Sequence, residues 1–359
     1  MHLGIPALLD FFRAHRSEDS LVLATIVDTE GSTYRKPGAM MLISREGAFE
    51  GMISGGCLEG DLLHHATKVF ETGEASFVTY DMHADDELVW GLGLGCDGVI
   101  HLMLQRLQKV DGFGFLEQLD ASHLAGNDGV LALVVKSGEP LPCGAFGFID
   151  SADISAGEAM LTQYLRDFCV PWPAWRTRRE TLDAGAGTLS IIKINMPAST
   201  RVLICGAGPD AVPVARMLSE LDWQVGIADH RVAFAREERF PAGCQVTLTR
   251  PERLCESIDL DGLDAVVIMS HHLENDCEYL KSVAGLDIPY IGVLGPKARR
   301  ERLCDMAGCG DREVYGPVGL DIGAELPAAI ALSLVAEIHA VLNHRKGIPL
   351  THRSDGQSS

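Results

Sequence analysis

The chain has 359 residues, a length that predicts two domains rather than one core. Its hydrophobic content of 47% and charged content of 22% are typical of a folded globular protein. The formal net charge of -20 excludes nucleic acid as a main partner, because phosphate contacts need clustered Lys and Arg. Ten cysteines without a C-x-x-C pair argue against a zinc ribbon or a dithiol motif. Charged residues interrupt the first and last apolar stretches, so we expect no secretory signal, no membrane span and a cytoplasmic location with free thiols.

The first half of the chain alternates apolar runs with amphipathic segments. A helix is expected over 5–16, and a second is expected to begin near Cys57 and to end before Gly73. A third helix is predicted near 156–168, before a break at Pro171–Pro173. From β-favouring runs, strands are predicted at 21–27, 39–43, 49–53, 76–80, 99–104, 130–135, 145–149 and 189–194.

From residue 201 the pattern changes to regular strand–turn–helix alternation, which predicts a parallel sheet with covering helices. The expected strands and helices are 201–205, 212–221, 224–228, 265–269, 290–294 and 328–342. We therefore expect an α/β chain in three parts. These are an N-terminal α/β domain of mixed sheet over 1–196, a Rossmann-like, doubly wound parallel sheet over 197–350, and a disordered tail over 351–359.

A glycine turn, G-A-G-P-D-A at 206–211, follows the first strand of the C-terminal domain. Gly206 permits the tight turn, Gly208 allows the backbone to approach a pyrophosphate, and Ala211 is small enough for helix–strand packing. Asp229 ends the next strand, where an acid can bind ribose hydroxyls. The strand, turn, helix and acid together predict a dinucleotide-type Rossmann domain.

The ligand of this domain stays open at the level of sequence, because a Rossmann fold can hold NAD(P), another nucleotide or nothing. Arg231 beside Asp229 keeps NADP or another phosphorylated ligand among the alternatives. His271 follows a predicted strand and is a candidate ligand contact at the strand ends, with a surface or capping role as the alternative.

Two glycine-rich loops of the N-terminal domain each carry a cysteine. Their sequences are S-G-G-C-L-E at 54–59 and G-L-G-L-G-C-D-G at 91–98. Gly55, Gly56 and Gly95 permit tight turns and close approach of a ligand. Cys57 stands at a predicted helix start, where the helix dipole favours a thiolate, although a small buried hydrophobe is the commoner role for one cysteine. Because Cys96 occupies a second loop of this kind, we expect the two to share a site.

A third loop, G-S-T-Y-R-K-P-G at 31–38, lies between two predicted strands. It is either a polar hairpin loop or an anion contact through Arg35 or Lys36. A metal site built from Cys57, Cys96 and nearby histidines has no recognised ligand spacing.

These motifs, in this order, resemble the xanthine dehydrogenase accessory factor family, XdhC/CoxI. The matching segments are 31–40, 54–59 and 91–98, the turn at 206–211, S-H-H-L-E-N-D at 270–276, Y-I-G-V-L-G-P-K at 290–297 and G-P-V-G-L-D-I-G at 316–323. The resemblance covers most of the chain and is weakest over 105–190. Thr33, Tyr34 and Pro296 depart from the usual family pattern.

The resemblance implies a non-catalytic, cytoplasmic chaperone for molybdenum cofactor (molybdopterin). Such a chaperone protects the cofactor during sulfuration and delivers it to a xanthine dehydrogenase or related molybdenum hydroxylase. A cysteine desulfurase or cofactor-synthesis protein is a further implied partner, and a homodimer is the default oligomer. The alternatives are an NAD(P)-dependent oxidoreductase and a pure protein–protein adaptor.

A soft thiolate suits a soft, sulfur-bearing metal centre, so Cys57 and Cys96 are the candidate molybdenum contacts. Glycine loops with an anion site suit a pterin and its phosphate. The candidate cofactor-binding residues are Arg35, Gly55, Gly56, Cys57, Glu59, Gly95 and Cys96 in the N-terminal domain, and Gly206, Gly208, Ala211, Asp229 and His271 in the C-terminal domain.

Overall fold

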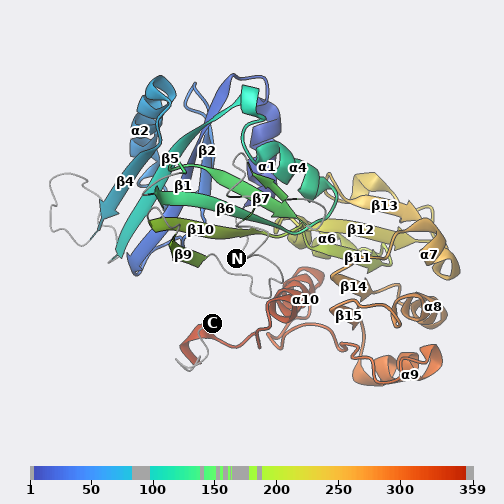
Figure 1. Cartoon of the computed structure of the whole chain (residues 1–359). Coiled ribbons are helices and arrows are strands. Elements are labelled where there is room, and N and C mark those ends of the chain that lie inside the picture. Colours follow the sequence, from blue (N-terminus) through green and yellow to red (C-terminus); the bar gives the residue numbers. More distant parts are fainter. Residues whose placement is uncertain are drawn as a thin grey trace. The chain divides into compact units, whose positions relative to one another are not determined.

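A computed structural model divides the chain into two compact units, Met1–Ala198 and Ser199–Ser359. The structure describes residues 4–82, 98–137, 141–150, 154–156, 161, 163, 178–183 and 188–352. Each unit has its own sheets and its own core (Figure 1). Within these residues, no helix has the length and apolar character that a membrane crossing requires.

The described residues of unit 1 form two five-stranded sheets. The first has the order β3-β2-β1-β5-β4, with β1 (Ser20–Gly31), β2 (Met40–Ile43), β3 (Phe49–Gly51), β4 (Ser76–Asp81) and β5 (Gly98–Gln108). The second has the order β8-β7-β6-β10-β9, with β6 (Gly129–Ser137), β7 (Phe146–Asp150), β8 (Ile154–Ala156), β9 (Arg178–Asp183) and β10 (Thr188–Met196). The helices of unit 1 are α1 (Ile5–His15), α2 (Glu59–Thr72) and α4 (Leu116–Leu124), within the same described ranges.

All strand pairs in the described part of unit 1 are antiparallel, which refines the expected mixed sheet. For consecutive strands joined by a short loop, the physical reason is the length of the connection. Between β2 and β3 the Ser44 N–H donates to the Ala48 carbonyl at 2.8 Å, and Gly47 takes a φ of 83°. A parallel pair would need a crossover of a dozen or more residues.

The predicted helix near 156–168 and the break at Pro171–Pro173 lie almost entirely outside the described residues. Of the predicted helix, the structure describes Ala156, which ends strand β8 (Ile154–Ala156), and Leu161 and Gln163, which are helical. The sequence did not predict α4, β8 or β9.

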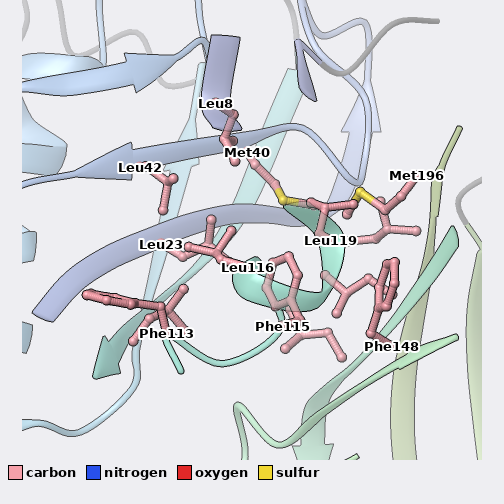
Figure 2. Close-up of a cluster of buried hydrophobic side chains, with 14 of the residues drawn as sticks. Leu8, Leu23, Met40, Leu42, Phe113, Phe115, Leu116, Leu119, Phe148 and Met196 are labelled. Atoms are coloured by element: carbon pink, nitrogen blue, oxygen red, sulfur yellow. The ribbon is translucent and has the colours of Figure 1, made fainter. Parts of the chain in front are cut away.

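Strand β1 is buried on both faces, which explains its continuous apolar run. Leu21 and Leu23 belong to a core that also takes side chains from the second sheet, α1 and α4 (Figure 2). Val22 and Ala24 point to the opposite face, where α2 covers the first sheet. Aromatic pairs lie in the first core: Phe12 with Phe113 and Phe115 with Phe146, at centroid distances of 5.4 and 5.9 Å.

Unit 2 is a parallel, doubly wound sheet of the order β13-β12-β11-β14-β15 in its described part. Its strands are β11 (Arg201–Cys205), β12 (Gln224–Asp229), β13 (Gln245–Leu248), β14 (Ala265–Ile268) and β15 (Tyr290–Val293). Helices α6 (Ala211–Ser219) and α10 (Pro327–Leu342) cover one face, and α7 (Leu254–Ser257), α8 (Leu273–Val283) and α9 (Lys297–Ala307) cover the other. The expected α/β fold class with a Rossmann-like C-terminal sheet is confirmed. The strand order reverses between β11 and β14, the point where such sheets bind ligands.

Candidate functional site

Three connections of unit 1 meet at one end of the first sheet. The antiparallel registers place the carboxyl ends of β1, β3 and β4 beside the starts of β2 and β5. Loop 31–38 follows β1, loop 52–58 follows β3, and Met82 donates its N–H to the Gly98 carbonyl at 3.0 Å across the ends of the β4–β5 connection. Gly95 and Cys96 belong to that connection and lie outside the described residues, so their role stays a prediction.

Close backbone packing holds the described loops at this end of the sheet. A Cβ atom on Gly98 would lie 2.6 Å from the Ser32 carbonyl oxygen and 2.7 Å from Thr33 Cγ2. A Cβ atom on Gly51 would collide with the backbone of Met40. Glycine is therefore required at both positions for loops 31–38 and 52–58 to leave the sheet as they do.

The loop that carries Cys57 is organised by a buried pair, Ser54 and Glu59. The Ser54 hydroxyl donates to Glu59 at 2.6 Å, and the N–H groups of Ile53, Ser54 and Leu58 donate to the same carboxylate at 3.2, 2.8 and 3.1 Å. Ser54 Oγ in turn accepts the N–H groups of residues 56–58 at 3.2, 3.0 and 3.1 Å. Glu59 is only 5% exposed, so its carboxylate holds the loop.

Burial alone would raise the pKa of Glu59, but the hydrogen bonds from the Ser54 hydroxyl and the loop backbone lower it below its ordinary value. The loop is thus built around a carboxylate. It leaves Gly55 and Gly56 exposed and the free thiol of Cys57 half-buried. Gly56 has a φ of 104°, which favours glycine. Helix α2 begins two residues after Cys57 and is followed by Gly73 in the left-handed region, which confirms the predicted helix.

Arg35 is a half-buried cation in loop 31–38. Its Nε is inaccessible to water and has no hydrogen-bond partner, and its guanidinium makes no ion pair with any residue that the structure describes. The Thr33 hydroxyl donates to the Arg35 carbonyl at 2.8 Å, which fixes the loop backbone. Lys36 is exposed, and so is Tyr34. In the described part of the chain, this positive charge is therefore without a partner, and it lies at the same end of the sheet as the Cys57 loop.

The glycine turn of unit 2 passes directly against the end of β14. Gly206 has a φ of 118°, and a Cβ atom there would lie 2.6 Å from both the Met269 carbonyl oxygen and the Ser270 nitrogen. A Cβ atom on Gly208 would lie 2.6 Å from Asp210 Oδ1. Ala211 is fully buried as the first residue of α6. This packing allows the turn to join β11 to α6 at the topological switch point.

Asp229 ends β12 and is 1% exposed. Its carboxylate accepts the Ala207 N–H at 2.7 Å and the Arg231 N–H at 2.8 Å. Arg231 adds two guanidinium hydrogen bonds, from Nε at 2.9 Å and Nη2 at 2.6 Å. Burial alone would raise the pKa of Asp229, and these hydrogen bonds lower it. Asp229 therefore links the glycine turn to Arg231 through a buried ion pair.

His271 bridges the loop after β14 and the start of α6. Its Nε2 lies 2.6 Å from Asp210 Oδ2, and its side chain is 59% exposed. It takes a φ of 62°, which is uncommon for a residue with a side chain. The structure thus brings four of the unit 2 candidates into one assembly with the turn: Gly206, Gly208, Asp229 and His271.

Sequence reasoning missed two buried carboxylate networks. It counted Glu59 as a cofactor contact and did not single out Ser54 as its partner. It also left out Asp276, which is fully buried and accepts from the Ser270 hydroxyl at 2.5 Å and from Arg299 at 2.6 Å. The available signal was a serine shortly before each helix followed by an acid in its first turn, an arrangement related to the capping box.

Together, these features define a two-unit α/β protein with a Rossmann-type C-terminal unit and a cysteine-bearing loop on its N-terminal unit. A family model for the XdhC Rossmann domain matches residues 202–338, and one for the XdhC and CoxI family matches residues 14–81. A probable xanthine dehydrogenase subunit of Bacillus subtilis (strain 168) is 30% identical over 341 residues, covering 94% of this chain and 96% of that protein. The chain belongs to the XdhC and CoxI family, as its motifs predicted.

Two further proteins are similar over most of their length. "Molybdenum cofactor insertion chaperone PaoD" of Escherichia coli (strain K12) is 22% identical over 331 residues, covering 90% of this chain and 84% of that protein. A crystal structure described as a xanthine dehydrogenase from Bacillus halodurans has a TM-score of 0.78 and 28% identity, and the match covers 96% of each chain.

Proposed function

We propose that this protein is an accessory factor that binds molybdenum cofactor and delivers it to a xanthine dehydrogenase-type molybdenum hydroxylase. Its family membership and the names of the Bacillus subtilis and Escherichia coli relatives support this proposal. The observation that carries it is that one end of the first sheet holds both the glycine loop of Cys57 and Arg35, whose guanidinium has no ion pair among the described residues.

The residues at this end of the sheet fit the chemistry of the cofactor. Arg35 is half-buried, and its guanidinium has no acceptor among the described residues, which suits a phosphate oxygen. Cys57 offers a sulfur donor, which suits a soft metal centre. No atom of the described residues lies within 4 Å of a Cβ built on Gly55 or Gly56, so a flat ring can approach the bare backbone. When bound, the cofactor supplies the redox centre for the client enzyme.

The remaining candidates take different roles. Ser54 and Glu59 position the loop, because their polar atoms are engaged within it. We keep Cys96 as the proposed second thiol. We further propose that the factor protects the cofactor during sulfuration, receives it through a cysteine desulfurase or cofactor-synthesis protein, and acts as a cytoplasmic homodimer. The alternative is an NAD(P)-dependent oxidoreductase. Its NAD-dependent form has weaker support, because Asp229 already accepts four hydrogen bonds from the protein.

The proposal is tested by molybdenum retained after anaerobic purification from cells that make the cofactor. We expect Cys57→Ala and Arg35→Gln each to lower the molybdenum-to-protein ratio about tenfold, since each removes one directed contact. Cys143→Ala and Arg16→Gln are matched controls, because both residues are exposed in the same unit and Arg16 already pairs with Glu117 at 3.3 Å. This site is rejected if neither Cys57→Ala nor Arg35→Gln lowers the molybdenum-to-protein ratio while the melting temperatures stay unchanged.

A further inference from the structure

The acid at the end of β12 has no capacity left for a ribose diol. Each oxygen of Asp229 already accepts two hydrogen bonds: Oδ1 from the Arg231 N–H and Nε, Oδ2 from the Ala207 N–H and Arg231 Nη2. In dinucleotide-binding Rossmann sheets, an acid at this position binds the 2′-hydroxyl of the adenosine ribose. A ligand with a free diol would here have to displace Arg231 from a buried carboxylate, at a large cost.

Two arginines beside the glycine turn have donors left over. Arg231 uses Nε and Nη2 on Asp229, and its side chain is 36% exposed. Arg239 donates from Nη1 to the carbonyl oxygens of Ala207 and Phe234 at 2.6 and 2.7 Å. Arg231 Nη1 and Arg239 Nε and Nη2 have no hydrogen-bond partner among the described residues. Both guanidinium groups therefore have N–H donors that the described residues around them do not use.

The ring of Phe234 holds these two cations together. The guanidinium carbon of Arg231 lies 4.1 Å from the ring centroid, and that of Arg239 lies 5.0 Å from it. Asp229 pairs with Arg231 alone. The nearby acid Asp210 is engaged by His271 at 2.6 Å. Arg239 has no ion pair with any residue that the structure describes, so its cation is left for a ligand at the end of β12.

We propose that unit 2 binds a nucleotide with a phosphate on its ribose 2′-oxygen, the chemistry that distinguishes NADPH from NADH. Arg231 and Arg239 would recognise this phosphate, because a phosphate dianion matches two guanidinium groups with free N–H donors. Their place at the end of β12 is where the adenosine ribose of a dinucleotide lies in this fold. The proposal concerns binding alone and uses no residue of unit 1, so it stands or falls separately from the cofactor site of Arg35 and Cys57.

The test compares 2′,5′-ADP with 5′-AMP, two ligands that differ only in the 2′-phosphate, by calorimetric titration of the full chain. We expect 2′,5′-ADP to bind at least about tenfold more tightly, the effect of a few charge-assisted hydrogen bonds. NADPH should likewise bind more tightly than NADH. Arg239→Gln should remove most of this preference. Arg236→Gln is the matched control, because Arg236 belongs to the same segment but is 63% exposed and lies 3.9 Å from Glu238.

Arg231 is tested together with its partner, since Arg231→Gln alone leaves a buried carboxylate without its cation. The double variant Asp229→Asn, Arg231→Gln keeps the charge balanced and should also lose the preference, with its fold checked by circular dichroism. Equal affinity for 2′,5′-ADP and 5′-AMP would overturn the proposal. So would no binding of either at millimolar concentration, or a preference unchanged in Arg239→Gln.

Discussion

The hydroxyl of Ser54 donates a 2.6 Å hydrogen bond to the buried carboxylate of Glu59, and both side chains lie beneath the loop that presents Cys57. The same hydroxyl oxygen accepts three consecutive backbone N–H groups. The position of the thiol therefore depends on two residues that do not themselves face the surface. Several experiments can separate this supporting role from ligand contact.

Ser54→Ala removes the acceptor for three N–H groups and one donor to a buried carboxylate. We expect it to lower the free energy of unfolding by about 2–3 kcal/mol in urea titrations, because buried polar groups lose their partners. Thr67→Ala is the control: its hydroxyl donates to the Leu63 carbonyl at 3.0 Å on the exposed side of α2. Its cost should stay within about 0.5 kcal/mol. Equal costs for the two variants would contradict a special role for Ser54.

Glu59 should make stability depend on pH in the acid range. Its folded pKa lies below the ordinary value of 4.5 because hydrogen bonds to the loop outweigh burial, so the unfolded chain binds the proton more readily. The stabilisation is complete above pH 4.5 and is lost as the pH falls through the lowered folded pKa. Between neutral pH and pH 3, the unfolding free energy should therefore fall less in Glu59→Gln than in the wild type.

Glu117→Gln controls for the loss of any carboxylate, since the Glu117 side chain is 44% exposed and its pair with Arg16 spans 3.3 Å. Its pH profile should run parallel to the wild type. A Glu59→Gln profile that is also parallel would show that the folded loop does not favour the charged form.

Removing either side of the Asp229–Arg231 pair should have unequal effects. Arg231→Ala leaves a 1% exposed carboxylate without a cation, and we expect a loss of about 3 kcal/mol at neutral pH. Asp229→Asn leaves Arg231, which is 36% exposed and can turn to water, so we expect a loss of only about 1–2 kcal/mol. Thermal and urea unfolding measure which of the two substitutions lowers the stability more. If Asp229→Asn costs more than Arg231→Ala, desolvation of the acid is not the dominant effect.

Gly206→Ala should destabilise unit 2 strongly. Its φ of 118° is unfavourable for alanine, and the added Cβ would lie 2.6 Å from backbone atoms of Met269 and Ser270. Backbone atoms cannot move aside as a flexible side chain can, so we expect a cost above about 3 kcal/mol or failure to fold. Gly285→Ala is the control, because no atom lies within 4 Å of a Cβ at Gly285. A Gly206→Ala protein as stable as Gly285→Ala would refute the close packing of the turn.

Four of the five strands that the structure describes in unit 2 were predictable almost to the residue, because they are short, mostly buried apolar runs. The expected 201–205 and 290–294 correspond to Arg201–Cys205 and Tyr290–Val293. The helix α9 was not predictable from periodicity, since Leu303 is its one fully buried residue among charged neighbours. Strand β13 escaped for a similar reason, because its residues are half-buried or exposed and carry no apolar run.

The candidate sites were predictable as backbone features and not as side-chain networks. Glycine at 206 and the glycines before Cys57 follow from turn geometry, which acts within a few residues. The hydrogen-bond partners of Glu59 and Asp229 were not predictable in this way. Their carboxylate oxygens accept from donors that come together only after folding. Asp229 fits a ribose contact by position, yet its pairing depends on which way the Arg231 side chain turns. No local spacing encodes that choice.

Met82 and Gly98 close the β4–β5 connection at its base with a 3.0 Å hydrogen bond, and Gly98 packs against Ser32. The length of a connection closed in this way has little effect on stability, since each doubling of its length costs only about 0.6 kcal/mol in closure entropy. We therefore expect the register of β4 and β5 to survive exchange of the residues between Met82 and Gly98 for those of another family member, with the proposed site residues Gly95 and Cys96 kept. An unchanged melting temperature in such a chimera would check this expectation.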